Sequence, residues 1–97
     1  MRIIAKKSLR EFWERHPDSE PPLQAWYLEV RKADWASPDQ VRGRFSNASI
    51  LRNNRVVFRI KGNAYRLVAK VVYARRIVYI RFVGTHAEYD RIDAEGV

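Results

Sequence analysis

The 97-residue chain contains no cysteine, only two histidines and no long apolar run. Without cysteine it has no disulfide scaffold, no thiolate zinc site and no cysteine nucleophile. His16 and His86 alone argue against a protein metal site, although carboxylates could still hold a hard cation. No apolar stretch approaches the ~18–20 residues that cross a bilayer. The charged N-terminal segment MRIIAKKSLREFW is not a secretion signal, so we expect a cytoplasmic protein.

Acidic residues are missing from one long block of the chain. Residues 40–87 hold eleven basic side chains and no acidic one, whereas residues 1–39 hold seven of each. The formal net charge is +8, and fourteen of the nineteen basic residues are arginine. A surface made for solubility alone normally mixes charges of both signs. The block therefore predicts a polyanionic partner, and arginine suits the forked recognition of phosphate.

The chain has no repeat, linker or low-complexity segment, and its length and 46% hydrophobic content predict one folded domain over residues 1–97. Residues 2–5 (RIIA) are typical of a short strand. Ser8 and Glu11 have the spacing of a capping box, which predicts a helix that starts at Ser8. Pro17 disfavours helical backbone at the residue before it and should end this helix.

Two further helices are predicted before the basic block. Ser19 followed by Pro21 and Pro22 is typical of a helix start, because proline is tolerated in the first turn. Ser37-Pro38 predicts a third, short helix in the same way. Apolar residues at helical spacing should face the core in the first two helices: Leu9, Phe12, Trp13 and His16, then Leu23, Trp26, Tyr27 and Val30.

The basic block predicts an antiparallel sheet. Arg55–Ile60, Ala64–Tyr73 and Ile77–Val83 are rich in valine, isoleucine, tyrosine and phenylalanine, which favour strands. Gly62-Asn63 is a two-residue hairpin signal between the first two strands. Tyr73–Arg76, or its central pair alone, forms the next turn.

These turns fix a register that separates apolar residues from charged ones. A slip of one residue in either turn would bring charges into the core. The predicted pairs include Arg59 with Arg66, Lys70 with Tyr79, Val68 with Arg81 and Leu67 with Phe82. One uncharged face should receive the helices: Val56, Phe58, Ile60, Tyr65, Leu67, Ala69, Val71, Val78, Ile80 and Phe82. The opposite face should be open and basic: Arg55, Val57, Arg59, Arg66, Val68, Lys70, Val72, Ile77, Tyr79, Arg81 and Val83.

The segment after the last strand carries groups suited to proton transfer. Gly84 should end the strand and Thr85 should cap a short helix, which would place His86, Tyr89 and Asp90 on one side. Such groups beside a basic surface can cleave RNA without metal, because one takes the 2′-hydroxyl proton, another donates to the 5′-oxygen and cations stabilise the phosphorane. Without catalysis the same residues would form a plain RNA-binding face, and Tyr89 could equally stack on a base or pack in the core.

Two segments of the chain, Asn53–Lys70 (NNRVVFRIKGNAYRLVAK) and Ile80–Ile92 (IRFVGTHAEYDRI), resemble the HigB family of bacterial toxins, which belongs to the RelE-like group of toxin–antitoxin systems. The resemblance covers essentially the full length, and GNAYRLV and GTHAEYD are its most specific pieces. It implies a RelE-like α+β fold, in which an N-terminal strand and two to three helices pack on one face of a curved, roughly four-stranded antiparallel sheet.

The resemblance also implies a function, namely an mRNA endoribonuclease that acts by 2′-hydroxyl attack, without a cofactor, on mRNA in the ribosome. A HigA-like antitoxin with a helix-turn-helix domain would bind and silence it. Arg66 resembles the arginine that contacts the scissile phosphate, Tyr89 resembles a C-terminal tyrosine of many members, and His86 and Asp90 match the HigB-type ending. Lys61 and Lys70 are possible counterparts of the basic residue that other members use as general base. The predicted catalytic residues are Arg66, Arg81, His86, Tyr89 and Asp90, and the predicted RNA-binding residues are Arg55, Arg59, Lys61, Lys70 and Tyr79.

Two other functions fit the same basic face. A non-catalytic RNA- or ribosome-binding module would bind with a strong dependence on salt and leave RNA unbroken. A protein-interaction domain would instead meet an acidic partner. Membrane binding fits less well, because the cations lie on predicted strands and not on an amphipathic helix.

Overall fold

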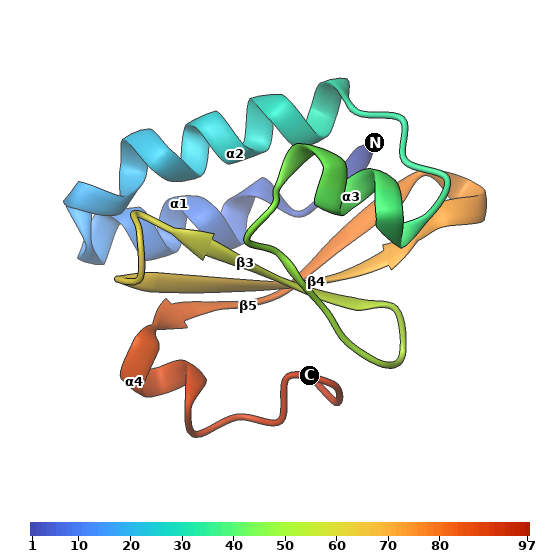
Figure 1. Ribbon diagram of the computed structural model, residues 1–97. Coiled ribbons are helices and arrows are strands. Elements are labelled where there is room, and N and C mark those ends of the chain that lie inside the picture. The colour runs from blue at the N-terminus through green and yellow to red at the C-terminus, as the bar shows by residue number, and fades with distance from the viewer.

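A computed structural model describes residues 1–97 and shows an α+β fold built on one five-stranded sheet (Figure 1). The strand order is β1-β5-β4-β3-β2, and β1 alone runs parallel to its neighbour. The predicted α+β class is confirmed, and the sheet gains one short strand, β2, over the four expected. The strands are β1 Arg2–Ile4, β2 Ser49–Ile50, β3 Arg55–Ile60, β4 Tyr65–Val72 and β5 Ile77–Thr85.

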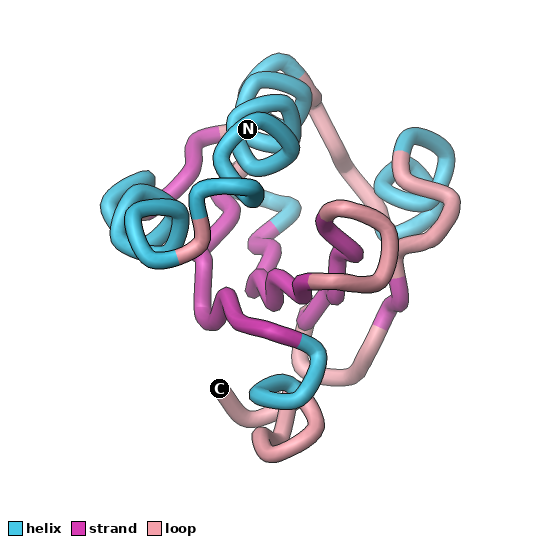
Figure 2. The backbone as a smooth tube through the Cα atoms, turned by 90° about the vertical axis from the view of Figure 1, so that its left-hand side faces the viewer, coloured by secondary structure: helices cyan, strands magenta, loops and turns pink.

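Three helices cover one face of this sheet, and a fourth lies on the other side with the C-terminal segment (Figures 1 and 2). The three are α1 Lys6–Arg15, α2 Glu20–Lys32 and α3 Pro38–Arg44, and the fourth is the short α4 His86–Tyr89. Two 3-10 turns, η1 Pro17–Ser19 and η2 Tyr73–Arg75, connect elements. None of the helices is both long and apolar enough to span a membrane.

The predicted start of the first helix is wrong. Only Ala5 separates β1 from α1, and its extended backbone makes it the residue that precedes the helix. The chain therefore turns into the helix at Lys6, and Ser8 lies inside α1 instead of capping it. The other two predicted starts agree with the structure, since α2 has its prolines in the first turn and α3 begins at Pro38.

The core lies between the sheet and α1–α3, as the apolar pattern predicts. Phe12 and Trp26 reach it from the helices and Phe58 from β3, with Trp26 and Phe58 in edge-to-face contact at 5.3 Å between ring centroids. The predicted helix stripes are buried except for Trp13, His16 and Tyr27, which are half-buried. Eight of the ten predicted sheet residues are buried in this cluster: Val56, Phe58, Ile60, Tyr65, Leu67, Ala69, Val71 and Val78.

The register is predicted correctly between β3 and β4 and only in part between β4 and β5. Every predicted β3–β4 pair is present, as is the pairing of Lys70 with Tyr79. The pairs of Val68 with Arg81 and of Leu67 with Phe82 are wrong, because the register shifts between Val68 and Ala69. Val68 pairs with Phe82 instead, so Arg81 is an extra residue on β5.

This bulge exchanges the faces of the two residues that follow it. Val83 packs against the core and Phe82 lies on the opposite face, the reverse of the prediction. Gly84 leaves room for the Phe82 ring, since a Cβ on Gly84 would lie 2.5 Å from Phe82 Cζ. The alternating pattern alone does not reveal the shift, because phenylalanine and valine are both apolar.

Candidate active site and nucleic-acid interface

The sheet face opposite α1–α3, which we call the second face, is basic but not fully open. Val57 and Val68 are buried there, and Arg55 and Arg66 are only 8% and 7% exposed. The prediction that this face is open is therefore wrong in part, because α4 and residues 90–97 cover part of it (Figure 1). Its strand residues are Arg55, Val57, Arg59, Arg66, Val68, Lys70, Val72, Ile77, Tyr79, Arg81, Phe82 and Gly84.

Arg66 lies beneath α4 with its guanidinium held by the β3–β4 hairpin. Its Nη1 donates to the main-chain oxygens of Asn63 at 2.9 Å and of Tyr65 at 3.3 Å. Its Cζ is 6.0 Å from the centre of the Tyr89 ring, within the range of a cation–π contact. These bonds use only one of its three nitrogens, so Nε and Nη2 retain donors for a phosphate.

A capping box fixes the start of α4. The Glu88 main-chain N–H donates to Thr85 Oγ1 at 3.1 Å, and the Thr85 main-chain N–H donates to the Glu88 carboxylate at 2.8 Å. The bond from the Thr85 N–H lowers the pKa of Glu88. The His86 N–H also donates to the main-chain oxygen of Ala64 at 3.2 Å, which ties α4 to the hairpin that holds Arg66. The prediction that Thr85 caps a short helix is confirmed, although β5 continues through Gly84 to Thr85.

His86 and Asp90 form a pair on the exposed side of α4. His86 Nδ1 lies 3.1 Å from Asp90 Oδ2, and both side chains are more than half exposed. The predicted helical spacing thus brings the two together. A carboxylate at Nδ1 favours the tautomer that carries a proton there, which leaves Nε2 free to accept one.

A basic hollow lies farther along the second face, beyond the bulge. It encloses about 290 Å³ and is lined by Lys70, Val72, Arg75, Tyr79 and Arg81. Lys70, Arg75 and Arg81 are cationic, and no lining residue is acidic. The hollow brings together the predicted site residues Lys70, Tyr79 and Arg81. It lies apart from the group formed by Arg66, His86, Tyr89 and Asp90.

The remaining predicted RNA-binding residues lie elsewhere. The Arg55 guanidinium donates to the main-chain oxygen of Val97, with Nε at 2.9 Å, and to that of Asn53 at 2.8 Å. Lys61 points away from the second face and pairs with Asp18 at 2.6 Å. Arg59 is exposed and forms no hydrogen bond or ion pair with another residue.

Sequence reasoning missed two residues of the second face. Arg75 lines the basic hollow from the η2 turn. The turn itself is predicted, so its charge could have been counted with the strands. Phe82 lies between Arg66 and the hollow, and only recognition of the bulge could have placed it there.

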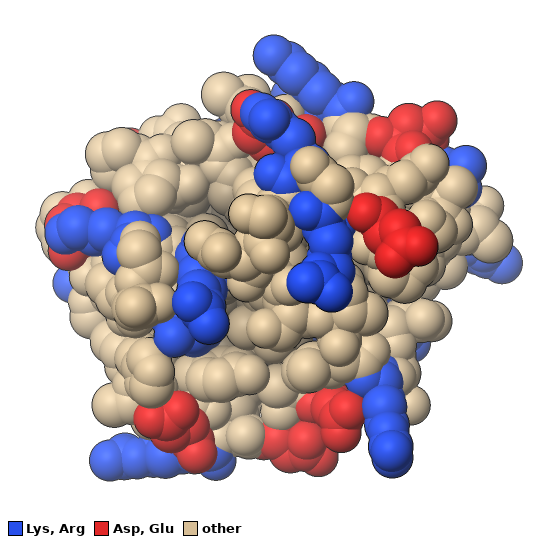
Figure 3. Space-filling model, viewed as in Figure 1, with Lys and Arg blue, Asp and Glu red and all other residues tan.

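Acidic side chains lie on both sides of the sheet. Figure 3, in which the second face points down, shows them beside basic groups over the helices and over the C-terminal segment. In that segment Glu95 accepts a hydrogen bond from the Arg52 main-chain N–H at 3.0 Å, and its own main-chain oxygen accepts one from Asn53. No three histidine or carboxylate side chains lie together as a metal site would require.

Three helices on one face of a small, mostly antiparallel sheet form the fold of the small RelE-like toxins. A family model described as HigB toxin, the RelE-like toxic component of a toxin–antitoxin system, matches residues 19–92. The chain belongs to this HigB toxin family.

Curated relatives span nearly the whole chain. The mRNA interferase toxin HigB of Escherichia coli K12 is 30% identical over 92 residues, which cover 93% of this chain and 88% of that protein. The mRNA interferase HigB of Escherichia coli O6:H1 is 27% identical over 94 residues, which cover 95% of this chain and 91% of that protein.

Proposed function

We propose that residues 1–97 act as one toxin domain that cleaves mRNA on the ribosome. The observation that carries this proposal is the placement of Arg66, Tyr89 and the His86–Asp90 pair at one end of a basic sheet face. Membership of the HigB toxin family and relatives named mRNA interferase support it. The chemistry is attack of the 2′-hydroxyl on the adjacent phosphate.

The proposed site supplies each element that this attack requires. His86 Nε2 takes the 2′-hydroxyl proton while Asp90 holds Nδ1 and stabilises the imidazolium that forms. The free nitrogens of Arg66 hold the scissile phosphate and the charge that develops on the phosphorane. The Tyr89 hydroxyl donates a proton to the departing 5′-oxygen. Because Tyr89 covers Arg66, the ring moves aside when the phosphate enters.

The basic hollow binds the RNA on one side of the cleavage point. Lys70, Arg75 and Arg81 contact backbone phosphates, and Tyr79 offers an aromatic surface for a base. Arg59 extends the positive surface at the edge of the sheet. Burial of Arg55 under the C-terminal segment gives it a structural role in place of the predicted RNA contact.

The proposed setting follows from the family. A toxin–antitoxin system implies a partner protein that silences this chain. We propose an antitoxin of the HigA type, with a helix-turn-helix domain, and a cytoplasmic site of action where ribosomes translate mRNA.

Expression in bacteria tests the proposal, with growth and mapped mRNA ends as the two measurements. The wild type should stop growth and produce new 5′ ends within coding regions. Arg66→Ala should lower the cleavage rate about 100-fold or more, the loss typical of a donor that stabilises transition-state charge. Arg10→Ala, which removes an exposed arginine on α1, should cleave like the wild type.

Because Arg66 is buried, folding must be separated from chemistry. Thermal unfolding followed by circular dichroism checks each variant, and His86→Ala changes an exposed side chain that leaves the core untouched. Purified wild-type protein that binds ribosomes or RNA tightly yet leaves every transcript intact would contradict the enzyme proposal and favour a non-catalytic binding module.

A further inference from the structure

One edge of the sheet is only half covered. β2 pairs with β3 at two positions, Ile50 with Val56 and Ser49 with Val57, and the residues before Ser49 lie outside the sheet. The rest of β3, Phe58–Ile60, has β4 on one side and no strand on the other. Unpaired strand edges are templates for the addition of another strand.

The hydrogen-bond pattern identifies the free groups on this edge. The Val71 N–H donates to the Asn54 oxygen across the β3–β4 ladder, and the Leu51 N–H donates to the Arg55 oxygen on the β2 side. Main-chain groups alternate between the two sides along an antiparallel strand, so odd-numbered residues of β3 face β2. Beyond the end of β2, the N–H and C=O of Arg59 therefore point outward without a partner.

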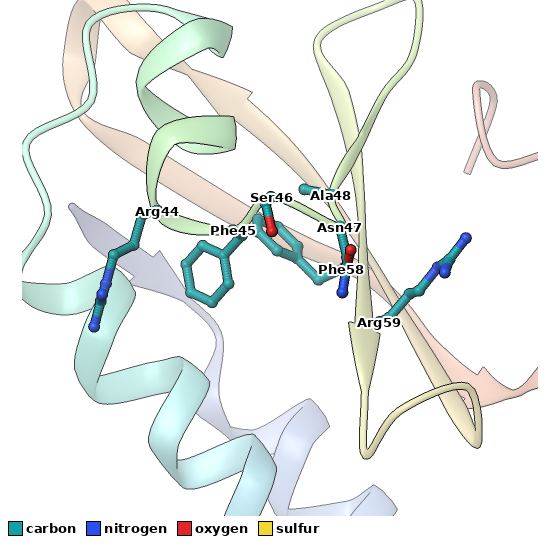
Figure 4. A pocket seen from close by; sticks show the side chains of 7 residues that line it. All are labelled: Arg44, Phe45, Ser46, Asn47, Ala48, Phe58 and Arg59. Carbon is teal, nitrogen blue, oxygen red and sulfur yellow. The ribbon is translucent and has the colours of Figure 1, made fainter.

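A groove that is apolar between Phe45 and Trp26 and polar at Ser46 and Asn47 runs beside these free groups, on the helix side of the sheet. Two pockets of about 240 and 210 Å³ meet at Phe45 and Arg59. Figure 4 shows the Phe45 and Phe58 side chains between α3 and β3, and Arg59 extending from β3 in the opposite direction. Trp26 and Ala25 of α2 line the second pocket. The Trp26 indole N–H is buried and has no acceptor.

The unpaired charge at the groove is positive. The only carboxylate that lines either pocket is that of Glu29, and Arg44 binds it with two nitrogens. Lys61 is paired with Asp18, whereas Arg59 is unpaired. An added strand would alternate its side chains, facing Arg59 with one set and the apolar groove with the other.

We propose that the open edge of β3 is a docking site for an extended segment of a protein partner in which acidic and apolar residues alternate. The partner's main chain bonds to the N–H and C=O of Arg59. Its apolar side chains enter the groove between Phe45 and Trp26, and its carboxylates meet the Arg59 guanidinium. Arg59 pairs across the sheet with Arg66, so this docking site adjoins the proposed RNA-cleaving site and shares Arg59 with its basic surface, but docking does not depend on cleavage.

A short fluorescent peptide that alternates glutamate with leucine or valine provides the probe, with fluorescence anisotropy as the measurement. It should bind the intact chain and slow hydrogen exchange of the Arg59 amide in NMR spectra. The same peptide with proline at its centre should bind weakly, since proline removes a main-chain donor and disrupts strand pairing.

Two matched pairs of variants locate the site. Ala25→Trp fills the groove from an exposed helix position and should weaken binding at least about tenfold, whereas Gln24→Trp places the same side chain outside the groove and should bind like the wild type. Arg59→Glu should weaken binding by repulsion, and Arg10→Glu, the same reversal on α1, should not.

Three results would overturn the proposal: no binding, equal binding by Ala25→Trp, or unchanged exchange at the Arg59 amide. Dimers of the chain alone that Ala25→Trp dissociates would assign the edge to a second copy and would also overturn it. None of these measurements involves RNA, so they remain separate from the test of cleavage.

Discussion

The arginines of the second face divide into buried and exposed ones, and the division decides what each can do. Arg55 and Arg66 donate to main-chain oxygens, as a buried cation must when water is excluded. Arg59 and Arg81 are exposed and their charge is available to a partner. Replacement of Arg55 should therefore mainly lower the stability of the fold, whereas replacement of Arg81 should mainly weaken binding to a partner.

Asp18 gives the fold a testable dependence on acid. Its carboxylate accepts bonds from Lys61 at 2.6 Å and from the Tyr65 hydroxyl at 2.5 Å, and these bonds hold the pKa of Asp18 below its usual 3.8. A lowered pKa in the folded state contributes stability above pH 3.8, and this contribution is lost as the pH falls through the folded pKa. Denaturant unfolding of Asp18→Asn should lack this acid-dependent loss.

The same bond gives Tyr65 the opposite dependence. Asp18 raises the pKa of Tyr65 above 10.0, so the contribution of Tyr65 to stability is present below pH 10.0 and lost as the pH rises through the folded pKa.

Glu11→Gln, which changes an exposed carboxyl of α1 that accepts no hydrogen bond, serves as the control for Asp18→Asn. An Asp18→Asn variant with the acid profile of the wild type would show that the interaction does not stabilise the fold.

Among the elements, β5 pairs with β4 in two different registers, one in each half of the strand. Up to Ile80 it follows the register set by the η2 turn, and from Phe82 onward it follows a register shifted by one residue. The extra residue, Arg81, leaves Ile80 and Val83 packed on the core and projects its own charge outward. Bulges commonly redirect side chains in this way next to functional surfaces.

Deletion of Arg81 should therefore be tolerated by the fold. Without it the ladder becomes regular, Phe82 still pairs with Val68, and every core residue of β5 keeps its face. Thermal unfolding should change little, while RNA binding should weaken through the lost cation. Deletion of Tyr79, from the regular part of the same strand, should prevent folding because it moves its flanking residues to the wrong face. Unfolding caused by the Arg81 deletion would contradict this account of the bulge.

Local pattern predicts some elements and misses others for physical reasons. The β3–β4 hairpin follows from its turn and from alternation that only one register satisfies. α1 begins at Lys6 because β1 ends only two residues earlier, and β1 is held in place by its pairing with the distant strand β5. The spacing of Ser8 and Glu11 contains no information about that pairing. Bulges are missed because they do not alter the composition of a strand.

The candidate site is predictable in the same uneven way. His86 and Asp90 come together because helical spacing alone is enough. α4 covers Arg66, and the C-terminal segment covers Arg55. Both covers depend on long-range hydrogen bonds, from the His86 N–H to Ala64 of the hairpin and from Arg55 to Val97. The sequence therefore identifies the basic residues without distinguishing the buried from the exposed ones.

At the scale of the whole molecule, the basic excess should make RNA binding depend on salt. Binding to single-stranded nucleic acid weakens with salt by a slope of about 0.7 for each phosphate neutralised, on logarithmic axes. Lys70→Ala and Arg81→Ala should each reduce the slope by about this amount, because both cations line the basic hollow. Arg10→Ala should leave it unchanged. Filter binding across a salt series measures the slope, and an unchanged slope in both hollow variants would place the RNA elsewhere.

The position of α4 after β5 has a consequence for synthesis. Translation proceeds from the N-terminus, so every strand of the sheet leaves the ribosome before His86, Tyr89 and Asp90. A nascent chain that stalls at Thr85 already carries the basic strands but lacks all three of these side chains. Under the proposed function, truncated translation products would hold RNA without cutting it.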